Sequence, residues 1–315
     1  MLKRALYSLI NQSLDKEMYE IVVVDNASKD DTQIVINEIK THFPSVVSVF
    51  EANQGLGYAR NTGYKHAKGT YVAFIDDDCL ASKEWLQNIL HCYETVKPEP
   101  WSVGGLILPI YNTVKPVWFK DRYETDSWGE QPRYLLRGES FTGCNMSFQK
   151  SILQLYGGFD VAFDMKGDSL SLAGETEFFR RIWLAGGKRC AFYYSPKAVV
   201  HHVIDPYKMT VGYQLKRAFT AGQASCAMSA FDSAFRRCIL FFGSITLLIG
   251  KSLMALMLIR LGRNKRNWAV ENLYPVASHC GRLLAFCGIR PTFRQRHPQP
   301  LTSEPRIKPQ SSYAS

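Results

Sequence analysis

Short apolar runs alternate with helical repeats along the N-terminal part of the chain. The apolar runs lie at residues 20–25, 46–51, 70–76, 101–109, 190–194 and 198–203. Helical spacing of apolar residues predicts helices at residues 2–13, 31–42, 56–67, 83–96 and 176–187. Strands that alternate with helices are typical of α/β domains. We therefore predict an α/β domain that ends near residue 228, with a loop at 110–140 that can cover a site.

The C-terminal part of the chain has a different pattern. Residues 239–261 form a long apolar run with basic residues on both sides, and residues 268–288 form a more polar helical segment. We predict that residues 229–289 are helical and membrane-associated, with spanning and surface-lying arrangements both open. Residues 290–315 are rich in Pro, Ser and Gln, and have too little apolar content to fold.

The net charge of +10 is concentrated in this C-terminal part. Residues 236–315 hold 13 basic and 2 acidic residues, a balance of +11, and residues 1–235 hold 25 and 26, a balance of −1. The basic residues flank an apolar run and do not interleave with exposed stacking aromatics. We therefore expect an anionic membrane surface as a partner, and no nucleic acid.

The eight cysteines are far apart and include no CxxC pair, which favours reduced thiols. The chain does not open with the pattern of a secretory signal. Together these features favour the cytoplasmic face of a membrane as the location.

Three adjacent carboxylates, Asp76, Asp77 and Asp78, follow the apolar run at 70–76. Ligands of open α/β sheets bind at the carboxyl ends of strands. Adjacent carboxylates repel one another, and a bound Mg²⁺ or Mn²⁺ relieves that repulsion. In an extended segment Asp76 and Asp78 would project to the same side. The alternative is a solvated acidic turn.

Two further segments carry candidate ligand-binding residues. Asp25 ends the apolar run at 20–25, where a carboxylate could accept hydrogen bonds from a base or a ribose, or could simply mark a strand-to-helix turn. Residues 53–63 place glycines at the start of a predicted helix, with Arg60 and Asn61 one turn further on. Backbone amides and a guanidinium at such a place suit phosphate groups.

Seven segments in this order resemble the family 2 glycosyltransferases, whose catalytic domain has the nucleotide-diphosphosugar transferase (GT-A) fold. They are residues 5–13, 20–32, 53–63, 69–86, 143–160, 174–188 and 195–203. The resemblance covers roughly residues 2–228 and implies a mixed, mostly parallel sheet flanked by helices. It also implies that an apolar strand precedes residue 1 and lies between the strands at 20–25 and 70–75.

The resemblance assigns roles to the polar residues. Asp25 would contact the nucleoside, Asp76 the ribose or the metal, and Asp78 the metal that bridges the diphosphate. The candidate donor-binding residues are Asp25, Asn53, Gly57, Arg60, Asn61, Asp76 and Asp77. The candidate metal ligands are Asp76, Asp78 and His202. His202 fits a family pattern in which this His joins the metal in some relatives, although a lone His on a strand is more often packed.

Two glutamates are candidates for the general base. The family usually has Glu-Asp-x-Asp/Glu, with the first Asp taking the acceptor proton, and this chain has Gly-Glu-Thr-Glu at 174–177. Glu175 would then replace the Asp, and Glu177 is the second candidate for the base. The alternative is that both only favour the N-terminus of a helix.

The implied activity is inverting transfer of one sugar by a hexosyl-type glycosyltransferase, from a nucleotide-diphosphosugar donor to a hydroxyl acceptor. The acceptor would be a glycolipid, a polysaccharide or a cell-envelope glycan precursor, and the cofactor Mg²⁺ or Mn²⁺. A metal-dependent nucleotidyltransferase and an inactive fragment of a glycosyltransferase are the alternatives.

Overall fold

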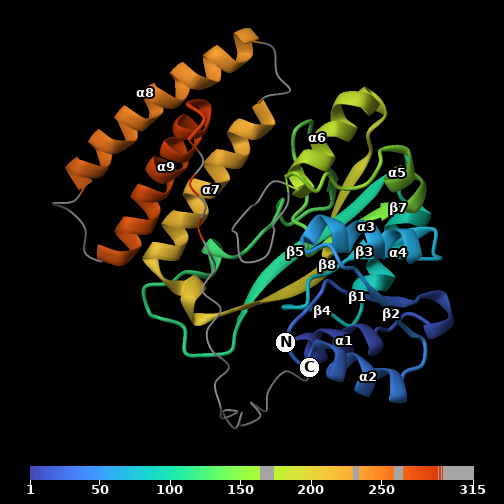
Figure 1. Cartoon of the computed structure of the whole chain (residues 1–315). Coiled ribbons are helices and arrows are strands. Elements are labelled where there is room, and N and C mark those ends of the chain that lie inside the picture. Colours follow the sequence, from blue (N-terminus) through green and yellow to red (C-terminus); the bar gives the residue numbers. More distant parts are fainter. Residues whose placement is uncertain (164–173, 230–233, 259–264, 290, 292, 294–315) are drawn as a thin grey trace.

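A computed structural model describes residues 1–163, 174–229, 234–258, 265–289, 291 and 293 (Figure 1). Nearly all of the tail predicted to be disordered, residues 290–315, lies outside the described residues. The helices and strands of the described parts follow the predicted order, with boundaries that move by a few residues.

A two-stranded parallel sheet forms the N-terminal layer of the molecule. It consists of β1 (Ile21–Asp25) and β2 (Val46–Phe50). The helices α1 (Leu2–Ile10) and α2 (Thr32–His42) bury their apolar faces against it, as the helical spacing predicts. The buried residues of this layer are Leu6, Ile10, Val23, Ile36, Ile39 and Val46. A third helix, α3 (Leu56–His66), packs on β1 and β2.

A six-stranded mixed sheet forms the centre. Its strands are β3 (Tyr71–Phe74), β4 (Cys79–Ala81), β5 (Ser102–Tyr111), β6 (Arg133–Tyr134), β7 (Met146–Gln149) and β8 (Phe192–Ile204). Their order is β3-β7-β5-β8-β4, with β6 also paired to β8. The helices α4 (Trp85–Thr95), α5 (Lys150–Leu155) and α6 (Gly174–Gly186) accompany this sheet (Figure 1).

The prediction of a mostly parallel sheet is wrong for the described residues. Four of the six strand pairings are antiparallel. The reason is that β7 enters between β3 and β5 from a loop and not from a crossover helix, and that β4 turns back directly after β3.

The two strands predicted at 190–194 and 198–203 are one strand, β8. Its register against β5 shifts between Gly105 and Ile107, so the chain continues through Pro196 without leaving the sheet. A Cβ at Gly105 would lie 1.9 Å from the carbonyl oxygen of Ala198, so a glycine is needed at this shift.

Three helices lie together to one side of the central sheet (Figure 1). They are α7 (Val211–Ser229), α8 (Ala234–Leu258) and α9 (Lys265–Phe286). Glycines let α7 and α9 approach closely, because a Cβ at Gly222 would lie 1.8 Å from the Ser278 carbonyl oxygen. Within the described residues, every helix is too short or too polar for a bilayer crossing. Single 3-10 turns occur at Lys16–Met18, Asp121–Tyr123, Gly187–Arg189 and Pro206–Met209.

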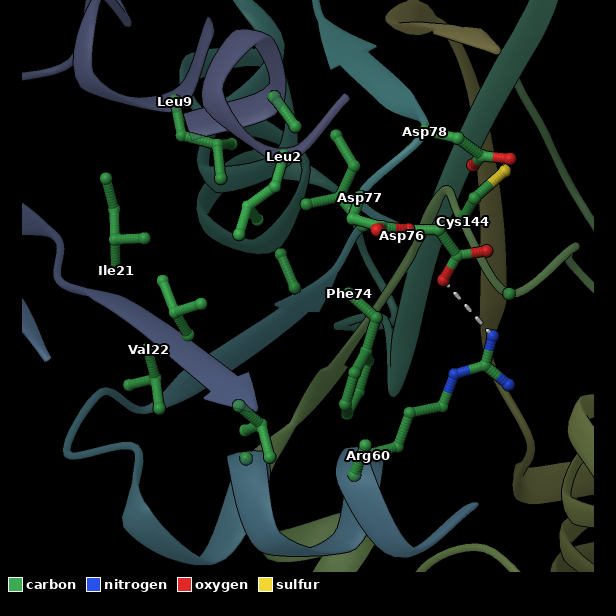
Figure 2. Close-up of a pocket in the computed structure, with 18 of the residues that line it drawn as sticks. Leu2, Leu9, Ile21, Val22, Arg60, Phe74, Asp76, Asp77, Asp78 and Cys144 are labelled. Atoms are coloured by element: carbon green, nitrogen blue, oxygen red, sulfur yellow. Dashed lines mark ion pairs between the residues drawn. The ribbon is translucent and has the colours of Figure 1, made fainter. Parts of the chain in front are cut away.

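The facing edges of β1 and β3 are not paired with each other, and the two strands belong to different sheets. A cavity of about 1660 Å³ separates them. Figure 2 shows apolar side chains of α1 and β1, among them Leu2, Leu9, Ile21 and Val22, opposite Phe74 of β3. The described residues therefore contain a gap at the position where the resemblance places a strand.

We predict that hydrogen exchange will reveal these open edges. Backbone amides of β1 and β3 that point into the cavity should exchange much faster than neighbouring amides bonded to β2 or β7, because no strand protects them. Mass-spectrometric or NMR exchange measures this directly. Equal protection of alternate amides along β1 would contradict the open gap.

Candidate active site

A tight turn after β3 positions the three aspartates. The predicted strand at 70–76 ends at Phe74, so Asp76, Asp77 and Asp78 lie in the turn and not in an extended segment. The amide of Cys79 donates to the carbonyl oxygen of Asp76 at 3.1 Å, which closes the turn. Asp76 and Asp78 nevertheless lie on the same side of the cavity (Figure 2).

Strand pairing brings Asp78 to His202. β4 begins immediately after the turn and pairs with β8, with Cys79 opposite His202. The amide of Val203 donates to the carbonyl oxygen of Asp78 at 2.8 Å. His202 Nε2 consequently lies 3.2 Å from Asp78 Oδ2. Two residues far apart in the sequence thus form a pair that the sheet holds in place.

Lys208 contacts both residues of this pair. Its ammonium lies 3.1 Å from Asp78 Oδ2 and 3.1 Å from His202 Nε2. Burial acts to raise the pKa of Asp78, but the hydrogen bond with His202 and the charge of Lys208 hold this pKa well below its usual range. Burial acts to lower the pKa of Lys208, and the charge of Asp78 raises it. Asp78 is therefore ionised and Lys208 protonated.

Arg60 joins Asp76, the first carboxylate of the turn, to Glu175, the predicted base. Its guanidinium lies 3.5 Å from Asp76 Oδ1 and 3.4 Å from Glu175 Oε2 (Figure 2 shows the first contact). Burial raises the pKa of Asp76 to about 6, although the charge of Arg60 opposes this effect. Burial and the charge of Asp78 raise the pKa of Asp77. The neighbouring carboxylates of Asp78 and Glu175 also act to raise the pKa of Asp76, so the acidic groups at this end of the cavity repel one another.

The donor set fits a divalent cation. Asp78, Cys79 and His202 each place one ligand atom within 4.8 Å of the others. The hydrogen bond with Cys144 and burial raise the pKa of the Cys79 thiol, so a neutral sulfur, a poor ligand, faces the pair. Asp78 and His202 are the better ligands, and carboxylate with imidazole suits Mn²⁺. The raised pKa of Asp76 is consistent with a place for added positive charge.

The structure brings six of the predicted residues to one cavity and leaves five outside it. Those that line the cavity are Arg60, Asp76, Asp77, Asp78, Glu175 and His202. Those that do not are Asp25, Asn53, Gly57, Asn61 and Glu177.

Local hydrogen bonds occupy the polar groups of Asp25 and Asn61. The buried carboxylate of Asp25 accepts from the amide of Ser28 at 3.0 Å and from the side chain of Gln33. Burial acts to raise the pKa of Asp25, but these bonds lower it. The amide group of Asn61 makes two bonds, 2.8 and 2.9 Å long, with the backbone of Phe159. Both residues hold the fold around the cavity.

Residues 53 and 57 lie at the start of α3. Asn53 bonds to Glu51 through both its amide groups. Gly57 is buried in the first turn of the helix. The neighbouring Gly55 has a φ of 147°, which favours glycine, and donates its amide to Asn26 Oδ1 at 2.7 Å. The glycine-rich segment thus packs α3 against the turn after β1.

Glu177 is paired inside its own helix. Its carboxylate, 3% exposed, accepts two bonds of 2.8 Å from Arg181. Arg181 also donates to the carbonyl oxygens of Tyr156 and Gly158. A carboxylate held this way is poorly placed to take a proton from a substrate, so the geometry favours Glu175 as the base.

Sequence reasoning missed several residues that line the cavity. Lys208, Glu124 and Arg217 meet there from the turn after β8, from the loop at 110–140 and from α7. Arg217 bonds to Glu124 at 2.9 Å. The only sequence signal for Lys208 is its short distance along the chain from His202. For Glu124 we find none.

Comparison with known proteins relates the chain to glycosyltransferases. The family model for glycosyl transferase family 2 matches residues 1–137. The chain is 26% identical over 218 residues to a glucosyl-dolichyl phosphate glucuronosyltransferase of Haloferax volcanii, covering 67% of this chain and 68% of the relative. It is 24% identical over 213 residues to the succinoglycan biosynthesis protein ExoM of Rhizobium meliloti, covering 66% and 64%. It is also 33% identical over 111 residues to the minor teichoic acid biosynthesis protein GgaB of Bacillus subtilis, covering 35% of this chain but only 12% of that relative.

Two solved structures resemble the fold. A mannosyltransferase of Pyrobaculum calidifontis, in complex with GDP-Man and Mn²⁺, superposes with a TM-score of 0.60 at 18% identity, covering 90% of this chain and 83% of that one. GalNAc-T7 with UDP, GalNAc and Mn²⁺ gives a TM-score of 0.51 at 17% identity, covering 72% and 48%. These likenesses confirm the predicted GT-A fold.

We predict that Glu177→Gln destabilises the protein without affecting nucleotide binding. The substitution leaves the Arg181 guanidinium without its carboxylate, which should lower the free energy of unfolding by about 1–3 kcal/mol in urea denaturation. Glu38→Gln, which breaks an exposed pair with Lys3, is the control and should cost less than about 1 kcal/mol. A stable Glu177→Gln variant that fails to bind nucleotide would place Glu177 in the site.

Proposed function

We propose that this chain, whose residues 1–137 belong to glycosyl transferase family 2, transfers a single sugar from a nucleotide-diphosphosugar to a hydroxyl acceptor. The observation that carries the proposal is the arrangement within one cavity. Arg60 and Glu175 lie beside Asp76, and the pair of Asp78 and His202 lies across the same turn. A base and a cation site are thus close together, as displacement of a diphosphate requires.

The donor's diphosphate would lie at Asp78 and His202, the residues that would hold the divalent cation. Such a cation, when bound, offsets the charge of the leaving diphosphate. Asp76 lies at the same turn and is the candidate for the ribose, and Arg60 supplies a fixed positive charge beside it.

Glu175 would act as the general base. It lines the cavity, and its ion pair with Arg60 is long at 3.4 Å, so one oxygen can accept the proton of an acceptor hydroxyl. The hydroxyl would attack the anomeric carbon from the face opposite the leaving diphosphate. Configuration at that carbon would therefore invert.

The relatives suggest the class of acceptor. Their names refer to a dolichyl phosphate glycolipid, to succinoglycan and to teichoic acid. A glycolipid, a polysaccharide or a cell-envelope glycan precursor is therefore the acceptor class that we propose, at the cytoplasmic face of a membrane. The apolar side chains exposed on α8 are consistent with attachment to that surface. They are Phe242, Leu247, Ile249 and Leu253.

We predict that the protein with Mn²⁺ and its sugar nucleotide releases a nucleoside diphosphate, and that Glu175→Gln turns over at least about a hundredfold more slowly. The amide keeps the shape of the side chain but cannot take a proton, so affinity for the donor should stay within about threefold. A panel of sugar nucleotides, with chromatography of the products, measures both quantities.

The products also separate the alternatives. Release of pyrophosphate would identify a nucleotidyltransferase. A protein that binds no sugar nucleotide of the panel would support an inactive fragment. Normal turnover of Glu175→Gln would refute our assignment of the base.

We predict that α8 binds anionic membranes through its exposed apolar residues. Replacing Phe242 and Leu253 with Glu removes two apolar side chains from the lipid, each worth about 1.5–3 kcal/mol when fully buried. Sedimentation with phosphatidylserine vesicles should fall at least about tenfold. The control replaces Val114 and Val117, which are exposed apolar residues outside α8, with Glu and should sediment like wild type. Unchanged binding by the α8 variant would remove this helix from the membrane proposal.

A further inference from the structure

A buried ammonium group lies against the residues that would hold the cation. Lys208 is 8% exposed, and its Nζ atom lies 3.1 Å from both Asp78 Oδ2 and His202 Nε2. The turn at Pro206–Met209 follows the end of β8 and folds Lys208 back over the turn that carries Asp78. The resemblance to the family gave this residue no role.

The backbone of Lys208 is fixed while its side chain has a long stem. Its carbonyl oxygen accepts a bond of 3.0 Å from Gln214 of α7, and Gln214 also donates to Glu124 at 2.7 Å. Four methylene groups separate this anchored backbone from the ammonium. The head group can therefore move by several ångströms without any change in the fold.

A divalent cation and the Lys208 ammonium cannot share the same ligand atoms. The ammonium donates to Asp78 Oδ2 and lies 3.1 Å from His202 Nε2, so it occupies the space that a metal bound to these two atoms would take. Two positive groups within a few ångströms in a buried site also repel each other strongly. Binding of the cation must therefore release the ammonium. The nearest negative charge that arrives with the cation is the diphosphate of the donor.

We propose that Lys208 is a diphosphate-binding residue that occupies Asp78 and His202 in the free protein and turns onto the donor's diphosphate when a divalent cation takes its place. This inference rests on the proposed function. It explains why an ammonium is buried at the only His-containing metal cluster found among the described residues. Lys208 then offsets the charge of Asp78 before the donor binds and adds a second positive charge to the leaving group afterwards.

The two roles of Lys208 predict effects of opposite sign for Lys208→Met. Without the competing ammonium, the protein should bind Mn²⁺ alone about tenfold more tightly. With Mn²⁺ saturating, it should bind GDP or UDP about ten- to hundredfold more weakly, because one charged hydrogen bond is lost. The affinity for nucleoside monophosphates, which lack the second phosphate, should fall much less. Isothermal titration calorimetry measures each binding step.

Three further variants complete the experiment. Lys208→Gln is also uncharged and should shift both affinities in the same directions, which guards against a folding defect of the Met variant. Lys208→Arg keeps the charge and should retain most of the affinity for nucleoside diphosphates. Lys115→Met removes a surface lysine paired with Asp121 and should change neither affinity.

The outcomes distinguish this inference from the proposed function. If Lys208→Met and Lys208→Gln bind Mn²⁺ no more tightly than wild type, or bind GDP and UDP equally well, the inference is overturned. If the wild-type protein itself binds neither nucleoside diphosphate with Mn²⁺, the proposed function fails as well.

Discussion

Negative charge buried at one end of the central sheet is the constraint on which the site depends. Asp76, Asp78 and Glu175 share a cavity, and each has a buried or partly buried cation as its partner. Arg60 is 6% exposed, and a guanidinium buried without carboxylates would cost several kcal/mol. The glycine at 143 is part of the same arrangement, because a Cβ there would lie 2.1 Å from the Arg60 guanidinium. The carboxylates that pair with Arg60 and the glycine that makes room for its guanidinium are thus both needed to bury this side chain.

The sequence predicts the parts of this site that local pattern controls. Asp76 and Asp78 follow a strand, and Glu175 and His202 fall within family segments, so their approach to one cavity could be expected. Lys208 could not, because a turn beyond the end of β8 and a contact with α7 place it. For the same reason the bond between Glu124 and Arg217, which joins the loop at 110–140 to α7, has no sequence signal.

Physical causes also explain why some roles and pairings cannot be decided from the sequence. A polar residue at the end of a strand can bind a ligand or form hydrogen bonds with nearby protein groups. The sequence pattern is the same in both cases. The carboxylate of Asp25 accepts hydrogen bonds from Ser28 and Gln33, and the side chain of Asn61 donates to the backbone of Phe159. The sequence also does not show which strands pair with one another, because apolar runs predict strands but not their direction in the sheet. The antiparallel entry of β7 and the register shift within β8 depend on contacts between distant segments.

Two separate sheets carry the segments that the sequence predicts for the two halves of the donor site. The predicted cation ligands rest on the pairing of β4 with β8, whereas Asp25, the predicted nucleoside contact, belongs to the two-stranded sheet. No pairing of β1 with β3 joins these sheets in the described residues. One connection runs through α1 and the residues just after it, where Ser8 accepts from the amide of Ala81 at 3.0 Å and Gln12 donates to the carbonyl oxygen of Ser82 at 2.8 Å. A second connection runs through α3, where Arg60 lies beside Asp76 and Asn61 bonds to the backbone of Phe159. Because side-chain contacts of this kind are easier to displace than a strand ladder, we expect the paired segment around Asp78 and His202 to be the more rigid part. The distance to the nucleoside half then depends on what fills the cavity between β1 and β3.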